Sequence, residues 1–144
     1  MRFEGLNVIS AISPCGKLAY HIRSSRYQGV HIADFLRKLR KEFSPRKLII
    51  IWDGASSHNS KEVKLLLSCL DREKLELYKI PAHSPELNVD EQVWKYLKYE
   101  TNLRNLACKS FKELKEKLIY NIEKLKNNPQ RIIKMFRHPE CAFY

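Results

Sequence analysis

The 144-residue sequence predicts a single α/β domain built on a mixed β-sheet. Two short apolar segments separated by a turn open the chain, which is typical of an antiparallel hairpin. Two more apolar runs, at 47–52 and 75–80, alternate with segments of helical spacing, and this alternation indicates parallel strands joined by helices. The rest of the chain has helical periodicity only, so we expect a C-terminal helical tail.

The opening hairpin is expected from strands at 3–12 and 18–22 with a turn at 13–16. Apolar residues then recur at helical spacing over 30–43, with Arg and Lys on the opposite face. The Ser44-Pro45 pair ends that helix.

The next elements follow the same alternation. Residues 47–52 form a short continuous apolar run, which is typical of a strand covered on both faces. Asn59 with Glu62 matches a capping box and opens a helix. The strand at 75–80 precedes a proline-bearing loop and a helix over 88–101.

The tail begins with a second capping box, Ser110 with Glu113. The helix that follows has an apolar stripe made of Phe111, Leu114, Leu118, Ile122 and Leu125. This stripe permits a partner helix in a homodimer, but we expect it to pack on the sheet. A break at 127–129 separates it from a short basic segment at 130–137, which could add a last turn or two.

Charge indicates a polyanionic partner. Lys and Arg number 27 against 16 Asp and Glu, a formal net charge of +11, and nucleic acid is the usual partner of so basic a chain, although basic surfaces also aid solubility. No apolar stretch is long enough to span a membrane, and the start lacks a signal peptide, so we expect a cytoplasmic protein with no membrane partner. Four scattered cysteines predict reduced thiols: Cys15, Cys69, Cys108 and Cys141.

Two acids stand where an α/β protein binds ligands. Asp53 follows the apolar run, at the carboxyl end of a strand, although Asp-Gly is also an ordinary turn pair. Glu91 opens a helix, where it could hold metal or could complete a capping box with Asn88. Asp90 is the direct rival of Glu91 at the same helix start.

Three further residues could assist at such a site. His58 could steer a substrate or simply form a hydrogen bond near the helix that follows. Lys95 and Lys98 lie four and seven positions after Glu91, so a regular helix would place all three on one face. A phosphate backbone could lie there, although such lysines are commonly only solvated.

Three segments carry a family resemblance. IIWDGASSH at 50–58 resembles the second-aspartate motif of the mariner-type DDE transposases, in their bacterial and archaeal insertion-sequence branch. IPAHSPELNVDEQVW at 80–94 resembles the family signature LPPYSPxLNPxExxW, and ISAISPCGK at 9–17 resembles the family hairpin. The likeness covers most of residues 3–100.

The resemblance implies a ribonuclease-H-like fold and an enzyme that cuts and joins DNA at transposon ends and target sites. In such enzymes three carboxylates hold two Mg²⁺ (or Mn²⁺) ions. Asp53 and Glu91 match two of these positions, and Asp90 falls on a variable one. Gly54, His83 and Val89 depart from the usual Asn, Tyr and Pro without removing a ligand.

The first catalytic aspartate of the family has no counterpart here. It lies on a strand before the hairpin, whereas no residue before Phe3 could serve and Asp34 belongs to a helix. That strand normally separates the hairpin from the strand that ends at Asp53, so without it two sheet edges would be unpaired.

Two principal hypotheses follow. Residues 1–104 would be a partial catalytic core and residues 105–144 a helical extension, together the carboxy-terminal catalytic portion of a transposase. The alternative is an inactive remnant that retains only DNA binding or protein interaction. A related nuclease that recruits its first acid elsewhere is a weaker third.

Overall fold

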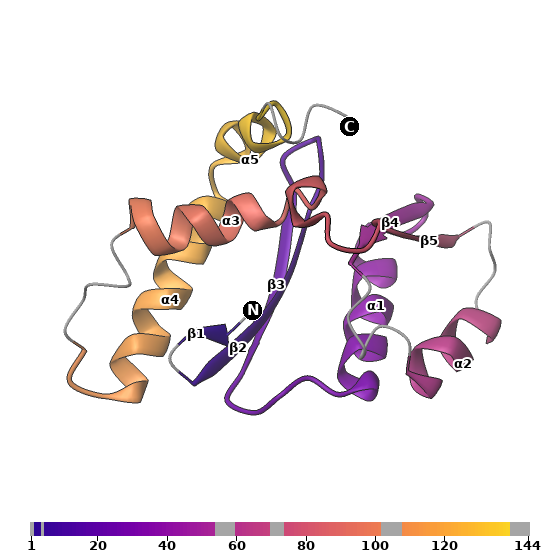
Figure 1. The fold of residues 1–144 in the computed structure, drawn as a ribbon, viewed down its shortest axis with the longest axis horizontal. Helices are drawn as coiled ribbons and strands as arrows, with labels where there is room; N and C mark the ends of the chain where they lie inside the picture. Colours follow the sequence, from indigo (N-terminus) through magenta and orange to yellow (C-terminus); the bar gives the residue numbers. More distant parts are fainter. Residues whose placement is uncertain (1, 4, 54–59, 70–73, 102–107, 139–144) are drawn as a thin grey trace. The chain divides into compact units, whose positions relative to one another are not determined.

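The computed structural model describes residues 2–3, 5–53, 60–69, 74–101 and 108–138 (Figure 1). The fold is mixed α/β, as predicted, with two small sheets and five α-helices among these residues. The chain divides into two compact units. The first comprises Met1–Ile22 and Val89–Tyr144, and the second comprises Arg23–Asn88.

The sheet of the first unit contains β1 (Arg2–Phe3), β2 (Leu6–Ile12) and β3 (Leu18–Arg23), in that order. β1 pairs antiparallel with β2. The prediction of one continuous strand over 3–12 was therefore wrong. Gly5, at φ +95°, lies between β1 and β2 and lets the chain turn back on itself.

The hairpin turn lies where the sequence predicted it. Gly16 adopts φ +89° and donates its N–H to the Ser13 carbonyl at 3.0 Å, while the Ser13 N–H donates to the Lys17 carbonyl at 3.0 Å. A left-handed φ favours glycine, so this position carries the turn between β2 and β3.

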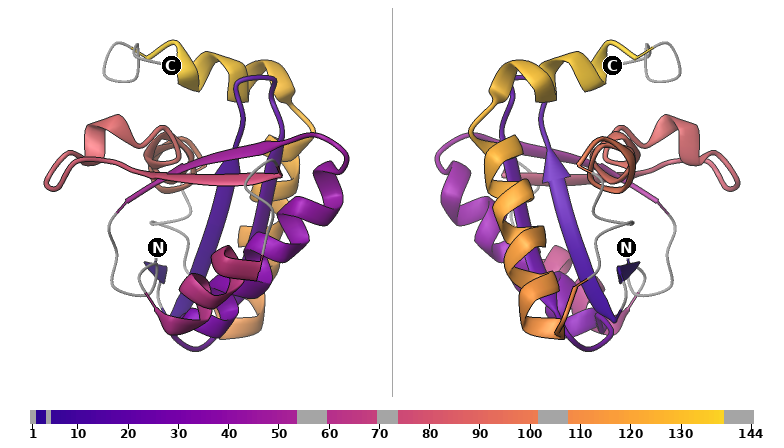
Figure 2. Two further views of the ribbon diagram at one scale, coloured as in Figure 1. Left: turned by 90° about the vertical axis from the view of Figure 1, so that its right-hand side faces the viewer. Right: turned by 90° about the vertical axis from the view of Figure 1, so that its left-hand side faces the viewer.

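Three α-helices complete the first unit: α3 (Glu91–Lys95), α4 (Phe111–Lys126) and α5 (Pro129–Phe136). α4 lies along the β2–β3 hairpin and α5 lies across its tip (Figure 2). Leu114, Leu118 and Ile122 of α4 share one core with Leu6 and Val8 of the sheet. The apolar stripe of α4 therefore packs on the sheet, as expected, except for Phe111 at its start, which is exposed.

The starts of α4 and α5 are capped by side chains, whereas the start of α3 is not. The Ser110 hydroxyl accepts the Glu113 N–H at 3.1 Å, which confirms the predicted cap of α4. The Glu113 carboxylate accepts the Lys109 N–H at 2.7 Å, and not the Ser110 N–H that a capping box requires, so the predicted box is not closed. α5 begins with Pro129 at its first position, and the Asn128 side chain caps it by accepting the Arg131 N–H.

The second unit contains α1 (Gly29–Phe43), β4 (Leu48–Trp52), α2 (Lys61–Cys69) and β5 (Leu75–Lys79). β4 and β5 pair in parallel, from Leu48 opposite Leu75 to Trp52 opposite Lys79, and this confirms the predicted parallel pairing. The buried apolar residues of this unit are Ile32, Ala33, Phe35, Leu36, Leu39, Val63, Leu66, Leu75 and Ile80.

β4 is covered on one face only. Ile49 and Ile51 are 60% and 43% exposed, while the residues that alternate with them are half-buried. The prediction of a strand covered on both faces was therefore wrong. β4 and β5 form a two-stranded sheet among the described residues, and its face bearing Ile49 and Ile51 is open to solvent.

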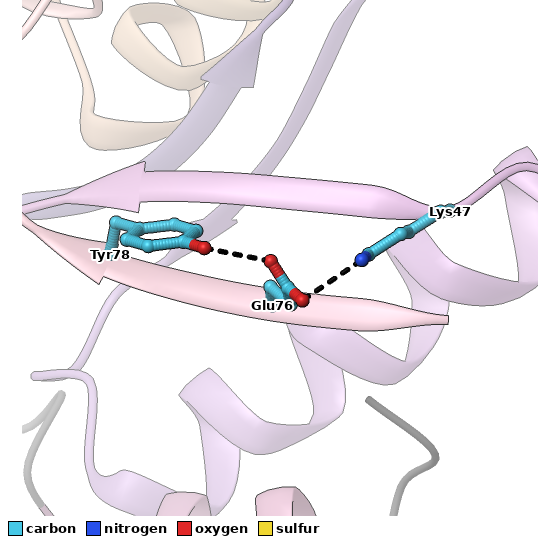
Figure 3. Close-up of polar contacts among 3 residues, drawn as sticks. All are labelled: Lys47, Glu76 and Tyr78. Carbon is cyan, nitrogen blue, oxygen red and sulfur yellow. Dashed lines mark hydrogen bonds and ion pairs between the residues drawn. The ribbon is translucent and has the colours of Figure 1, made fainter. Parts of the chain in front are cut away.

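A polar bridge crosses this open face (Figure 3). Glu76 lies opposite Ile49 in the register, and its carboxylate accepts hydrogen bonds from Lys47 Nζ at 2.9 Å and from the Tyr78 hydroxyl at 2.8 Å. The hydrogen bond to Glu76 raises the pKa of Tyr78. Because all three residues are at the surface, the bridge contributes little to stability.

The starts of α1 and α2 meet closely. α2 begins at Lys61, and the Ser60 hydroxyl accepts the Val63 N–H at 3.3 Å, so Ser60 caps the helix; Asn59, the predicted cap, lies outside the described residues. A Cβ placed on Gly29 would overlap both side-chain atoms of Ser60. Glycine at this position therefore lets the two helices approach.

Candidate functional site

Asp53 lies directly after β4, at the carboxyl end of the parallel pair. The Ile80 N–H donates to the Trp52 carbonyl at 2.8 Å, so backbone pairing continues up to the residue before Asp53. Asp53 is exposed. Parallel sheets bind ligands at this edge, so the strand positions an accessible carboxylate where a ligand could reach it.

Glu91 is the first residue of α3, a helix held by its apolar side. Val89, Val93, Trp94 and Leu97 are all buried in the core of the first unit. Glu91 itself is half-buried, and within the described part of the chain its carboxylate has neither a hydrogen bond nor an ion pair. The fold thus fixes the backbone of Glu91 while its carboxylate remains without a structural partner there.

The alternative role of Glu91 as a helix cap is not realised. Asn88 donates its N–H to the Pro85 carbonyl at 3.0 Å and ends a short 3₁₀ turn, Pro85–Leu87. The helix predicted from Asn88 therefore begins three residues later, at Glu91. Because the backbone N–H of Asn88 is bonded to Pro85, Glu91 does not close a capping box with it.

Asp90, the rival acid, is engaged with the sheet. The Ser10 hydroxyl on β2 lies 2.7 Å from each of the two Asp90 carboxylate oxygens and donates to them. This contact joins residues 80 positions apart and ties the start of α3 to the hairpin. Asp90 thus has a structural role that Glu91 lacks.

The basic residues near Glu91 are arranged less simply than a regular helix predicts. Lys95 is exposed and Lys98 is half-buried. After Lys95 the helix widens into a π-helical turn, Tyr96–Glu100, in which the Thr101 N–H donates to the Tyr96 carbonyl at 3.2 Å. The wider turn moves Lys98 away from the line through Glu91 and Lys95. His58 lies outside the described residues.

Arg131 is a residue that the sequence reasoning did not single out. From α5 it forms an ion pair with Glu100 and lies over the Tyr96 ring, 5.4 Å from the ring centre. Both partners belong to the π-helical turn, so Arg131 holds this irregular segment. No local pattern indicates the contact, because Glu100 lies 31 positions earlier in the sequence.

The donors at the two candidate positions suit a hard divalent cation. Mg²⁺ and Mn²⁺ prefer carboxylate oxygens, and Asp53 and Glu91 each offer a carboxylate that solvent reaches. Asp53 belongs to the second unit and Glu91 to the first. No group of three or more His, Cys, Asp or Glu residues suited to a metal occurs among the residues that the structure describes.

Comparison with known proteins identifies the family. The model of the DDE superfamily endonuclease family matches residues 2–115, so the chain belongs to this family. The match includes Asp53 and Glu91 and ends within α4. No curated protein matches the chain. None of the described helices is long and apolar enough to cross a membrane.

Proposed function

We propose that this chain is the carboxy-terminal catalytic portion of a mariner-type transposase, which cuts DNA at insertion-sequence ends and joins it to a target. The family match over residues 2–115 carries this proposal, because it assigns endonuclease chemistry to the segment that contains both candidate acids. The formal charge of +11 supports DNA as the substrate.

In this proposal Asp53 and Glu91 hold the divalent metal. Bound Mg²⁺ or Mn²⁺ supplies activation of a water or 3′-hydroxyl nucleophile and neutralises charge on the leaving oxygen. Asp53 presents its carboxylate from the end of a paired strand, and Glu91 presents its own from an anchored helix. Lys95, exposed one turn after Glu91, would contact a DNA phosphate.

We propose a ribonuclease-H-like core for residues 1–104, with residues 105–144 as its helical extension. The separate β1–β2–β3 and β4–β5 sheets support this architecture, because the family's first strand would pair between the hairpin and β4 and would bring the first aspartate. If no such strand is supplied, the inactive remnant is the alternative.

The test compares variants of the two proposed metal ligands with a variant of Asp90, the acid next to Glu91. In a product that includes the family's first strand, Asp53→Asn and Glu91→Gln should abolish Mg²⁺- or Mn²⁺-dependent cleavage of duplex DNA, whereas Asp90→Asn should retain it. Binding of Mn²⁺, followed by its electron paramagnetic resonance signal, should weaken in the first two variants only. Equal loss in Asp90→Asn would contradict the assignment of Glu91. A chain that neither binds Mn²⁺ nor cleaves DNA would favour the remnant.

A further inference from the structure

α5 and the residues just before it form a strongly basic segment of the chain. Between Lys124 and His138 the sequence contains no Asp or Glu. It contains five Lys or Arg residues, namely Lys124, Lys126, Arg131, Lys134 and Arg137. All five lie beyond residue 115, where the matched family region ends; Arg131 and Lys134 are on α5, and Arg137 directly follows its last residue.

The packing of α5 turns part of this charge outward. Ile132 and Met135 are buried in the core of the first unit. Lys134 and Arg137 are exposed and lie three positions apart, which places them on neighbouring parts of the outer surface. The core therefore fixes which side of α5 carries the cations.

The tip of the β2–β3 hairpin adds a further cation beside α5. A Cβ placed on Gly16 would lie 2.7 Å from Pro129 Cβ and 2.8 Å from the Pro129 carbonyl oxygen, so the turn touches the start of α5 (Figure 2). Lys17, the next residue of the turn, is exposed. Lys126, also exposed, ends α4 three residues before Pro129. The hairpin turn and the junction between α4 and α5 thus lie against each other, and each carries an exposed cation.

These four cations, Lys17, Lys126, Lys134 and Arg137, are here called the α5 platform. Within the described residues none of them forms an ion pair with a carboxylate, in contrast to Arg131, which pairs with Glu100. A cluster of like charges without counter-charges repels itself, and a polyanion relieves that repulsion by displacing small counterions.

We propose that the α5 platform is a docking surface for the phosphate backbone of duplex DNA. The proposal rests on the proposed function only in taking DNA as the polyanion. An anionic membrane fits less well, because a helix that lies on a membrane turns its apolar side outward, whereas α5 buries Ile132 and Met135. Phosphate contacts of this kind position DNA without reading its sequence.

The first experiment measures binding of a fluorescein-labelled DNA duplex by the full chain, in EDTA so that cleavage does not contribute. The platform variant reverses three charges: Lys126→Glu, Lys134→Glu and Arg137→Glu. The matched control reverses three exposed charges of the other unit: Lys38→Glu, Lys41→Glu and Arg46→Glu. Both variants have the same net charge, and circular dichroism checks that both are folded.

We expect the platform variant to bind at least about tenfold more weakly than the control, with a salt dependence smaller by about one unit of slope per lost contact. Equal weakening in both variants would mean that net charge alone drives binding, and would overturn the proposal. Tighter binding to duplex RNA, or to phosphatidylserine vesicles, than to DNA would also overturn it.

A second measurement uses the wild-type chain and Cys15, an exposed thiol in the hairpin turn beside Lys17. DNA should slow alkylation of Cys15 and leave that of Cys69, an exposed thiol of the second unit, unchanged. Protection of neither thiol would overturn the proposal. Asp53→Asn should keep both the binding and the protection, so a failure of cleavage is distinguished from a failure of docking.

Discussion

The contact between Ser10 and Asp90 predicts that neighbouring acids at the start of α3 have separable roles. Ser10 donates to Asp90 across the first unit, while Glu91 has no partner among the described residues. Truncating Asp90 to Ala should therefore destabilise the fold, and truncating Glu91 to Ala should not. The comparison is controlled, because the two side chains differ by one methylene and one position.

The size of the effect follows from the geometry. Both oxygens of Asp90 lie 2.7 Å from the Ser10 hydroxyl, but a hydroxyl has one hydrogen to donate, so the contact counts as a single bond. A hydrogen bond to a charged acceptor contributes about 1.5–3 kcal/mol, and half-burial of both residues favours the lower end. We expect a coupling free energy of about 1–2 kcal/mol, against a change within about 0.5 kcal/mol for Glu91→Ala.

A double-mutant cycle measures this coupling. Urea unfolding of the wild type, Ser10→Ala, Asp90→Ala and the double variant yields four free energies of unfolding, and their non-additivity is the Ser10–Asp90 term. Coupling below about 0.3 kcal/mol, which is the usual limit of additivity, would refute the structural role of Asp90. So would a loss in Glu91→Ala as large as that in Asp90→Ala.

Two further perturbations test the packing of each unit. Gly29→Ala should lower the free energy of unfolding by about 1–3 kcal/mol in urea titrations, although Ala normally favours a helix, because the new Cβ overlaps Ser60. Adding Ser60→Gly should recover most of that loss, because replacing the Ser60 cap by Gly costs only a few tenths of a kcal/mol. Burial and the hydrogen bond to Glu123 raise the pKa of Tyr20 in the folded protein. The stability that the protonated Tyr20 hydroxyl contributes is therefore complete below about pH 10, the pKa of tyrosine in the unfolded chain, and is lost as the pH rises above that value. Tyr20→Phe should reduce that alkaline loss of stability in pH-dependent urea unfolding, whereas Tyr120→Phe, at an exposed position, should not.

Local patterns predicted most of the helices and strands of this chain. The apolar stripe of α4 and the Ser110 cap repeat a helical period that needs no knowledge of the rest of the fold. The parallel pairing of β4 with β5 followed from the helix between them. These predictions succeeded because each depends only on residues that are close in the sequence. The stripe and cap of α4 depend on one or two helical turns, and the strand pairing depends on the single helix that connects the two strands.

The failures concern features that depend on what lies beside an element. The strand predicted over 3–12 is interrupted because Gly5 supports a reversal of the chain, and a single glycine inside an apolar pattern indicates such a break only weakly. Ile49 and Ile51 have the composition of a fully covered strand, yet both are exposed. Coverage depends on how many strands and helices lie beside β4, and the run itself contains no information on that.

The choice between Asp90 and Glu91 shows the same limit at the candidate site. Both are acids at one helix start, and the sequence next to Glu91 favours a cap over a metal ligand. What separates them is Ser10, which lies 80 positions away and binds Asp90. The family resemblance pointed to Glu91 without a physical reason, and the fold supplies one: Asp90 is occupied in holding α3 to β2, while the carboxylate of Glu91 makes no such contact within the described chain. If Glu91 binds metal, replacing it should therefore change Mn²⁺ affinity and leave stability unchanged, and replacing Asp90 should do the reverse.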